Sequence, residues 1–282
     1  MIIYAKTCER LIGIEVLKPY VEKYKGIEIQ MLSWDETEKI INIVENLKER
    51  FSEIQEITVH PPLNFSYNFE VLSYANFQRE IERVKCFVEV SKKYNVKMNL
   101  LYHTEWPYIA WKSSGIMQRL RELVNLLQNT NVNILIENIH TMNEREECTV
   151  LKVVKEIDNP HLGVCLDICH LHVQANIFGF NFNEFLSKFI NKEDCQKYVY
   201  QIHFAGTLDN DGYRRKETHG RKHDTMENFE ADFNLLKKYG IENKIIVSEI
   251  SENDYSTRVD QLEEIKMLEM GTVLLSTKMH MQ

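Results

Sequence analysis

Short apolar segments recur along the whole chain and are separated by longer amphipathic stretches. Each segment is rich in Ile, Val, Leu or Tyr, which is typical of strands that are buried on both faces of a parallel sheet. We expect strands at residues 2–6, 27–32, 56–60, 97–103, 133–138, 163–167, 198–204 and 245–250.

The stretches between these segments carry apolar residues at helical spacing. The first helix is expected around residues 17–26, with Gly26 as its C-terminal cap. The next begins with Ser33 and Glu36 in the spacing of a capping box and continues with apolar residues on one face. Further helices are expected at residues 77–94, 116–129, 146–157, 182–190, 227–240 and 258–270.

Strand and helix therefore alternate eight times, and no Pro-, Ser- or Gly-rich linker separates them. Eight β/α units in roughly 270 residues are the number and size of an α/β fold of the (β/α)8, or TIM barrel, type. An open, doubly wound sheet is the alternative, because periodicity does not show whether a sheet closes. We expect residues 1–270 to form a single catalytic domain, followed by a tail at 271–282 that lies outside the repeat.

Composition is that of a globular protein and argues against several other classes. Of the 282 residues, 44% are hydrophobic and 27% are charged, and the formal net charge is −8. This charge argues against a generic basic surface for nucleic acids. No window approaches the ~20 apolar residues of a membrane span, and the chain does not open with an apolar signal core. The six cysteines show no disulfide-framework spacing, so we expect a cytoplasmic protein with reduced thiols and no membrane partner.

Metal-capable side chains interrupt the apolar pattern at the C-terminal ends of strands three to eight. They are His60, His103, Glu137, Asp167 with His170, His203 and Glu249. In a parallel barrel these strand ends share one face, where active sites form. Burying so many acids and imidazoles without compensation would cost several kcal/mol per charged group. Bound cations remove that cost, so we predict a metal site, with His170 in the loop after its strand and facing the same cavity.

The segment after the seventh strand adds further candidates. Residues 205–224 contain Glu217 and His219 in an E-x-H pair, and Arg214 and Arg215 within a basic cluster. A long loop over a barrel mouth is more often functional than idle. The E-x-H pair would supply two more ligands, and the arginines suit the geometry of a phosphate. A solvated, charged loop is the alternative.

Several of these segments resemble the xylose isomerase-like TIM barrels and, among them, the apurinic endonuclease IV branch. The resemblance rests on TVHPPL, LLYHTEW, LIENI, GVCLDICH, QIHF, KETHG and VSEIS, of which GVCLDICH is the most specific. It implies up to three divalent ions, with zinc favoured and manganese or iron as alternatives. The implied ligands are His60, His103 and Glu137 for one ion, Glu137, Asp167, His203 and Glu249 for a second, and His170, Glu217 and His219 for a third.

The chain also departs from the endonuclease pattern. Glu217 stands where those enzymes usually carry an aspartate, and NIHTMNE replaces a glycine-bearing run after Glu137. No Tyr-Leu wedge is visible in HPPLNFSYN, and QMLSW keeps Trp34 without the arginine that probes DNA. Because these elements open the duplex at an abasic site, their absence argues against DNA as the substrate while leaving the metal site intact.

Two activities fit these residues. The favoured one is metal-dependent phosphoester hydrolysis, in which Glu137 bridges two ions and positions the attacking water, with abasic DNA or a smaller phosphorylated molecule as the substrate. The alternative is isomerisation or epimerisation of a sugar or sugar phosphate with one ion at Glu137, Asp167, His203 and Glu249. A barrel that only binds is disfavoured, because every ligand position carries a competent side chain. We expect three catalytic residues, Glu137, Glu249 and His170, and four substrate-binding residues, Arg214, Arg215, Trp34 and Trp106.

Overall fold

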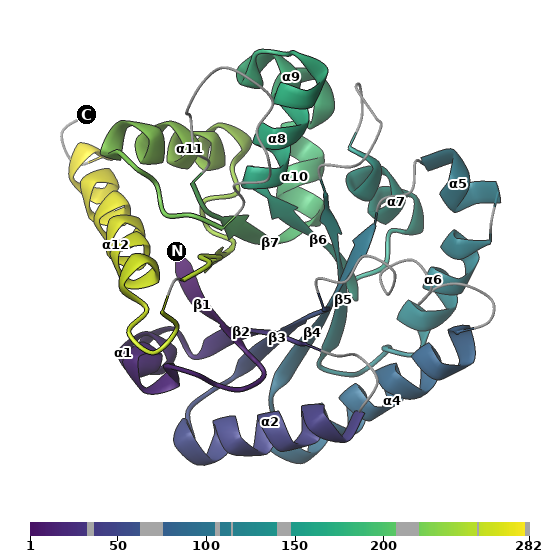
Figure 1. The fold of residues 1–282 in the computed structure, drawn as a ribbon. Helices are drawn as coiled ribbons and strands as arrows, with labels where there is room; N and C mark the ends of the chain where they lie inside the picture. Colours follow the sequence, from purple (N-terminus) through teal and green to yellow (C-terminus); the bar gives the residue numbers. More distant parts are fainter. Residues whose placement is uncertain are drawn as a thin grey trace.

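Eight parallel strands close into a barrel in the computed structural model of the chain, and helices surround this barrel (Figure 1). Each strand pairs with its neighbour in sequence, and β1 pairs with β8 to close the ring. The strands are β1 (Ile2–Cys8), β2 (Gly26–Gln30), β3 (Glu56–His60), β4 (Lys97–Thr104), β5 (Val132–Asn138), β6 (Leu162–Asp167), β7 (Val199–Phe204) and β8 (Ile245–Ser248). The predicted (β/α)8 barrel is confirmed, and the open sheet is excluded.

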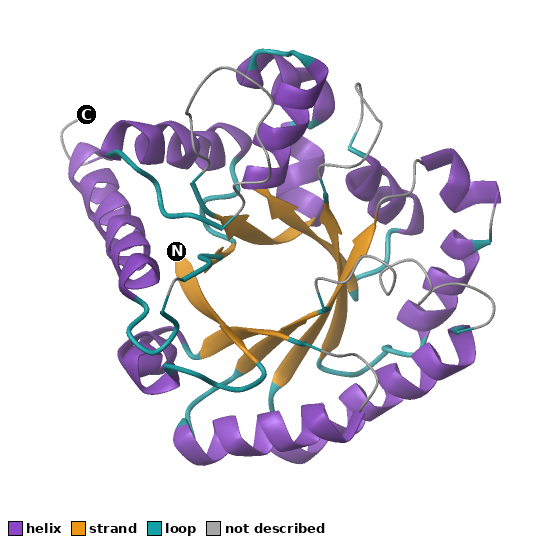
Figure 2. Ribbon diagram, in the orientation of Figure 1, coloured by secondary structure: helices purple, strands orange, loops and turns teal. Residues whose placement is uncertain are grey.

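The helices form an outer layer around the strands (Figure 2). The structure describes residues 1–32, 37–62, 76–104, 108–113, 115–139, 148–206, 220–252 and 254–279. The helices within these ranges are α1 (Ile14–Tyr24), α2 (Thr37–Arg50), α4 (Phe77–Tyr94), α5 (Tyr108–Ser113), α6 (Ile116–Asn125), α7 (Thr149–Ile157), α8 (Ile168–Phe178), α9 (Phe182–Phe189), α10 (Lys192–Tyr198), α11 (Met226–Tyr239) and α12 (Val259–Met279). Helix α12 thus continues past residue 270, where we expected a tail to begin. Within the described ranges, no helix has the length and apolarity needed to cross a membrane.

Gly26 does not cap the first helix, contrary to the prediction. Lys25 takes the left-handed conformation there, with a φ of 60°, and its N–H donates to the carbonyl of Val21. Gly26 instead begins β2, where a Cβ would lie 2.1 Å from the ring of Tyr4. Glycine is needed at this position because the aromatic ring occupies the space of a side chain. The predicted capping box of Ser33 and Glu36 lies outside the described residues.

The main apolar core lies between the barrel and its helices. Leu17 of α1, Phe87 of α4, Ile202 of β7 and Leu236 of α11 are among its fully buried members. Burial of such side chains is the dominant favourable contribution to folding. This outer core holds the helices against the strands and so fixes the strand ends relative to one another.

Polar side chains fill much of the barrel interior. The amide of Asn99 donates to Glu56 Oε1 at 2.8 Å and to Thr58 Oγ1 at 3.1 Å, and the Thr58 hydroxyl donates to Gln201 Oε1 at 2.8 Å. A small apolar cluster, Leu101, Leu135 and Cys165, accompanies these groups. The interior is therefore a directional hydrogen-bond network across strands, and this network lies directly beneath the candidate site.

Candidate metal centre

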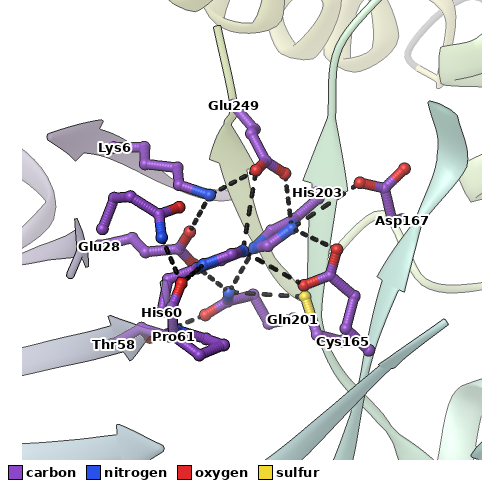
Figure 3. Close-up of polar contacts among 12 residues, drawn as sticks. Lys6, Glu28, Thr58, His60, Pro61, Cys165, Asp167, Gln201, His203 and Glu249 are labelled. Carbon is purple, nitrogen blue, oxygen red and sulfur yellow. Dashed lines mark hydrogen bonds and ion pairs between the residues drawn. The ribbon is translucent and has the colours of Figure 1, made fainter. Parts of the chain in front are cut away.

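The polar side chains at the ends of β3 to β8 converge inside the barrel. Figure 3 shows those of β3, β6, β7 and β8, namely His60, Asp167, His203 and Glu249. The register explains this convergence, because His103 lies opposite Glu137 and Asp167 lies opposite His203 on neighbouring strands. Every predicted ligand in the described part of the chain is buried: His60, His103, Glu137, Asp167, His170, His203 and Glu249. The structure thus brings together the side chains that the strand-end pattern singled out.

Glu137, Asp167, His203 and Glu249 each offer one ligand atom within 4.8 Å of the others. The Nδ1 atom of His203 lies 2.6 Å from Glu249 Oε2, 3.3 Å from Glu137 Oε1 and 3.8 Å from Asp167 Oδ2. No described residue makes a hydrogen bond to this buried nitrogen. Three carboxylates and one imidazole form a donor set that suits zinc, manganese or iron, so the residues fit a divalent ion.

His60, His103 and Glu137 form a second group of donors beside the first. The two Nε2 atoms lie 3.1 Å apart, and Glu137 Oε2 lies 3.5 Å from that of His60 and 3.2 Å from that of His103. The Nδ1 atom of His60 lies 2.8 Å from the carbonyl of Pro61, which can only accept a hydrogen bond. The proton of a neutral His60 is therefore on Nδ1, which leaves Nε2 available as a ligand.

Asp167 ends β6 and also caps the helix that follows. Its Oδ1 atom accepts the backbone N–H of His170 at 2.6 Å, and its own N–H donates to Asn138 Oδ1 at 2.8 Å. His170 consequently lies in the first turn of α8, not in a loop as predicted, because β6 leads directly into this helix. Its Nε2 atom lies 3.6 Å from Glu137 Oε1 and 3.9 Å from Asp167 Oδ2, so it faces the same group of carboxylates, as expected.

Part of the predicted site falls outside the described residues. This applies to Trp34, Trp106, Arg214, Arg215, Glu217 and His219. The third ion, which the resemblance assigns to His170 together with two of these residues, therefore stays a prediction. So does the anion-binding role of the two arginines.

Two charged residues of the site were missed in the sequence and come from β1 and β2. The ammonium of Lys6 lies 3.1 Å from Glu28 Oε1 and also forms an ion pair with Glu249 Oε1 (Figure 3). The other oxygen of Glu28 lies 2.9 Å from Nε2 of His203. A signal was present, because Lys6 in IIYAK and Glu28 in IEIQML interrupt apolar runs in strands buried on both faces.

Opposite charges hold these groups in their ionised forms despite burial. Burial alone would raise the pKa of Glu137, but His203 and His103 hold it well below its ordinary value. Burial would likewise lower the pKa of Lys6, but Glu249 and Glu28 raise it. The pKa of His60, in contrast, is lowered by burial and by the positive charge of Lys6, which favours the neutral, ligating form of the imidazole. At neutral pH the site therefore combines an ionised Glu137 with a neutral His60.

The chain belongs to the xylose isomerase-like TIM barrel family, whose sequence model matches residues 21–269. The resemblance to this superfamily is therefore confirmed, whereas the match does not single out the endonuclease IV branch. A search of curated proteins found no match to the sequence.

Solved structures with a similar fold cover nearly the whole chain. A D-tagatose 3-epimerase-like protein has a TM-score of 0.61 at 18% identity and covers 98% of this chain and 99% of its own. The 3-keto-D-glucoside 4-epimerase YcjR from E. coli has a TM-score of 0.60 at 14% identity, covering 96% and 99%. The IOLI protein with a zinc atom has a TM-score of 0.60 at 19% identity, covering 98% of both chains. At these identities the likeness shows the fold alone.

Proposed function

We propose that the chain is a metal-dependent isomerase or epimerase that acts on a sugar or a sugar-like hydroxy ketone. The observation that carries this proposal is the buried group of Glu137, Asp167, His203 and Glu249, whose ligand atoms lie within 4.8 Å of one another. This choice reverses the preference drawn from the sequence. Two of the structural neighbours are named for epimerases and a third carries zinc, which supports the alternative activity better than hydrolysis.

The two glutamates of this group have the chemistry that such a reaction needs. A divalent ion held by the four residues would supply Lewis acidity toward the carbonyl group of the substrate. In the proposed reaction, one carboxylate removes the proton from the carbon beside the carbonyl. In an epimerase, the other carboxyl group enters the step protonated and donates its proton to the opposite face of the same carbon, whereas in an isomerase the first group passes the proton it took to the neighbouring carbon. His203 and His103 hold the pKa of Glu137 well below its ordinary value, so this carboxylate is ionised and carries no proton before the reaction.

His170 and the closed floor of the barrel would complete the site. His170 faces Glu137 from the first turn of α8, where its Nε2 atom can donate a hydrogen bond to a substrate oxygen. Beneath the carboxylates, Thr58 and Gln201 are fully buried and bonded to each other, which keeps water away from the site on this side. Excluding water strengthens the electrostatic interactions within the site.

Phosphoester hydrolysis is the second candidate, and one observation favours it. His60, His103 and Glu137 form a further donor group that shares Glu137 with the first. Two ions bridged by Glu137 are the arrangement that hydrolytic sites use to stabilise the attacking and the leaving oxygen. In an epimerase with a single ion, His60 and His103 would not serve as ligands of a second ion.

The number of bound ions and the fate of a carbon-bound proton separate the two activities. We expect about one divalent ion per chain by elemental analysis, and uptake of deuterium beside the carbonyl when ketoses are incubated with the protein in D2O. Glu137→Gln should slow this exchange by roughly 10²- to 10⁴-fold, the usual contribution of a general base. Glu264→Gln alters a buried carboxylate on α12 that bonds to His223, which is not one of the four proposed ligands, and serves as the control. Two or more ions with cleavage of phosphoesters, and no exchange, would favour hydrolysis instead.

A further inference from the structure

The contact between Glu28 and His203 links the barrel interior to the candidate metal centre. Glu28 Oε2 lies 2.9 Å from Nε2 of His203, and both side chains are fully buried. An ionised carboxylate can only accept hydrogen bonds. The contact is therefore favourable only when His203 carries a proton on Nε2. The lone pair of a neutral His203 then lies on Nδ1, the nitrogen that faces Glu137, Asp167 and Glu249.

The network beneath this contact keeps Glu28 an acceptor. Asn99 donates to the Thr58 hydroxyl, so that hydroxyl directs its own proton to Gln201 Oε1. The amide nitrogen of Gln201 consequently points the other way and donates to Glu28 Oε2 at 2.6 Å. The same nitrogen lies 3.6 Å from Cys165 Sγ and 3.1 Å from His203 Nε2, but its shortest contact is the one to Glu28, the carboxylate that His203 also contacts (Figure 3).

Lys6 forms an ion pair with the other oxygen of Glu28 and with Glu249, one of the predicted ligands. Its ammonium lies 3.1 Å from Glu28 Oε1 and forms an ion pair with Glu249 Oε1. Glu28, His60, His203 and Glu249 could by their spacing alone hold a metal ion. The ammonium already bridges two members of this group, so it takes the place of a cation there.

We propose that Glu28, held by Lys6, is a positioning residue that fixes His203 in the tautomer whose Nδ1 atom binds the metal ion. Histidine ligands generally donate their other ring N–H to a carboxylate, a carbonyl or water, and this contact sets both the tautomer and the ring orientation. The inference rests on the proposed metal-dependent function, because it takes His203 as a ligand. It adds β2 and β1 to the strands that determine the site, although neither residue is among the four ligands.

Metal affinity in Glu28→Gln tests the inference without using activity. A glutamine has nearly the shape of glutamate, but its NH2 group can donate to Nε2 and so permits the tautomer with the proton on Nδ1. We expect Mn²⁺ or Zn²⁺ binding by the metal-free full chain to weaken by roughly 10- to 100-fold, measured by competition with a chelator. Glu264→Gln is the matched control, since Glu264 also contacts a buried imidazole, that of His223 at 2.6 Å, on the outer layer. Its metal affinity should equal that of the wild type.

A second measurement uses the unaltered chain and so does not depend on the folding of a variant. Long-range ¹H–¹⁵N NMR of the zinc-loaded protein with labelled histidines should show the proton of His203 on Nε2. In Glu28→Gln, the form with the proton on Nδ1 should appear. A proton on Nδ1 in the wild type, or unchanged metal affinity in a folded Glu28→Gln protein, would overturn the inference.

The outcomes also separate this inference from the proposed function. Weaker metal binding in Glu28→Gln together with no isomerase activity on any sugar supports the inference and contradicts the function. Isomerase activity in the wild-type chain, together with unchanged metal affinity in Glu28→Gln, supports the proposed function and contradicts the inference. If the wild-type chain binds no divalent ion at all, both are wrong.

Discussion

Asp167 caps α8 and is also a proposed metal ligand, and a pair of substitutions separates the two roles. Its Oδ1 atom caps α8 by accepting the N–H of His170 at 2.6 Å, while Oδ2 lies 3.8 Å from Nδ1 of His203 among the proposed ligands. Asp167→Asn keeps an oxygen for the cap but loses the negative charge. Asp167→Ala loses both. The difference in stability between the two variants therefore measures what the helix cap contributes to folding. Their shared loss of metal affinity measures what the carboxylate contributes as a ligand.

The expected magnitudes follow from these contacts. Asparagine caps a helix about as well as aspartate, whereas alanine at an N-cap costs about 1 kcal/mol. In the metal-free protein, Asp167→Ala should therefore unfold with a free energy about 1 kcal/mol below that of Asp167→Asn. Both variants remove one of the four carboxylate or imidazole ligands. We expect both to bind a divalent ion more than ~100-fold more weakly, since even residues that only orient a ligand contribute 10- to 100-fold.

Two assays test these values. Denaturant unfolding in excess chelator gives the stabilities of the metal-free proteins, and chelator competition gives the metal affinities. Equal stability of the two variants would refute the capping role. Metal affinity that survives in Asp167→Asn would refute the ligand role and, with it, the proposed donor group.

Two further predictions concern other parts of the barrel. Burial opposes the charge of His223, but its contacts with Asp232 and Glu264 raise the pKa from 6.5 to about 9. The protonated form therefore contributes about 3 kcal/mol of stability that is fully present below pH 6.5 and is lost as the pH rises through 9. Denaturant unfolding between pH 6 and 10 should show this loss in the wild type and a smaller one in His223→Gln, and equal slopes would contradict it. Gly26→Ala places a Cβ 2.1 Å from the Tyr4 ring and should lower the free energy of unfolding by about 1–3 kcal/mol. A melting temperature equal to that of the wild type would contradict this prediction, because it would mean that the Tyr4 ring moves aside without a loss of stability.

The barrel was predictable from the sequence because each of its strands is a separate apolar run. The expected segments at 56–60 and 163–167 match β3 and β6 to within a residue. Closure was not predictable, since the pairing of β1 with β8 depends on the curvature of the whole sheet. The end of α12 was missed because residues 271–279 lack the amphipathic pattern on which the helix predictions relied.

The convergence of the site could be predicted from the strand ends, but its internal chemistry could not. His103 and Glu137 were expected at the same face because parallel strands end together, and the register places them opposite each other. Lys6 and Glu28 were overlooked, because a single charged residue in an apolar run does not show which neighbours it meets across a barrel. Which nitrogen of His203 faces the ligands likewise depends on a contact between residues 175 positions apart in sequence.

The polar interior of the barrel also constrains how this protein can change in evolution. Thr58 must accept from Asn99 and donate to Gln201, so replacing any one of the three by an aliphatic residue leaves the others facing an unmatched partner. An apolar barrel interior can accept substitutions one at a time, because one aliphatic side chain of similar volume can replace another. Here the residues are inherited as a set, and related sequences should either keep all three or have exchanged them together.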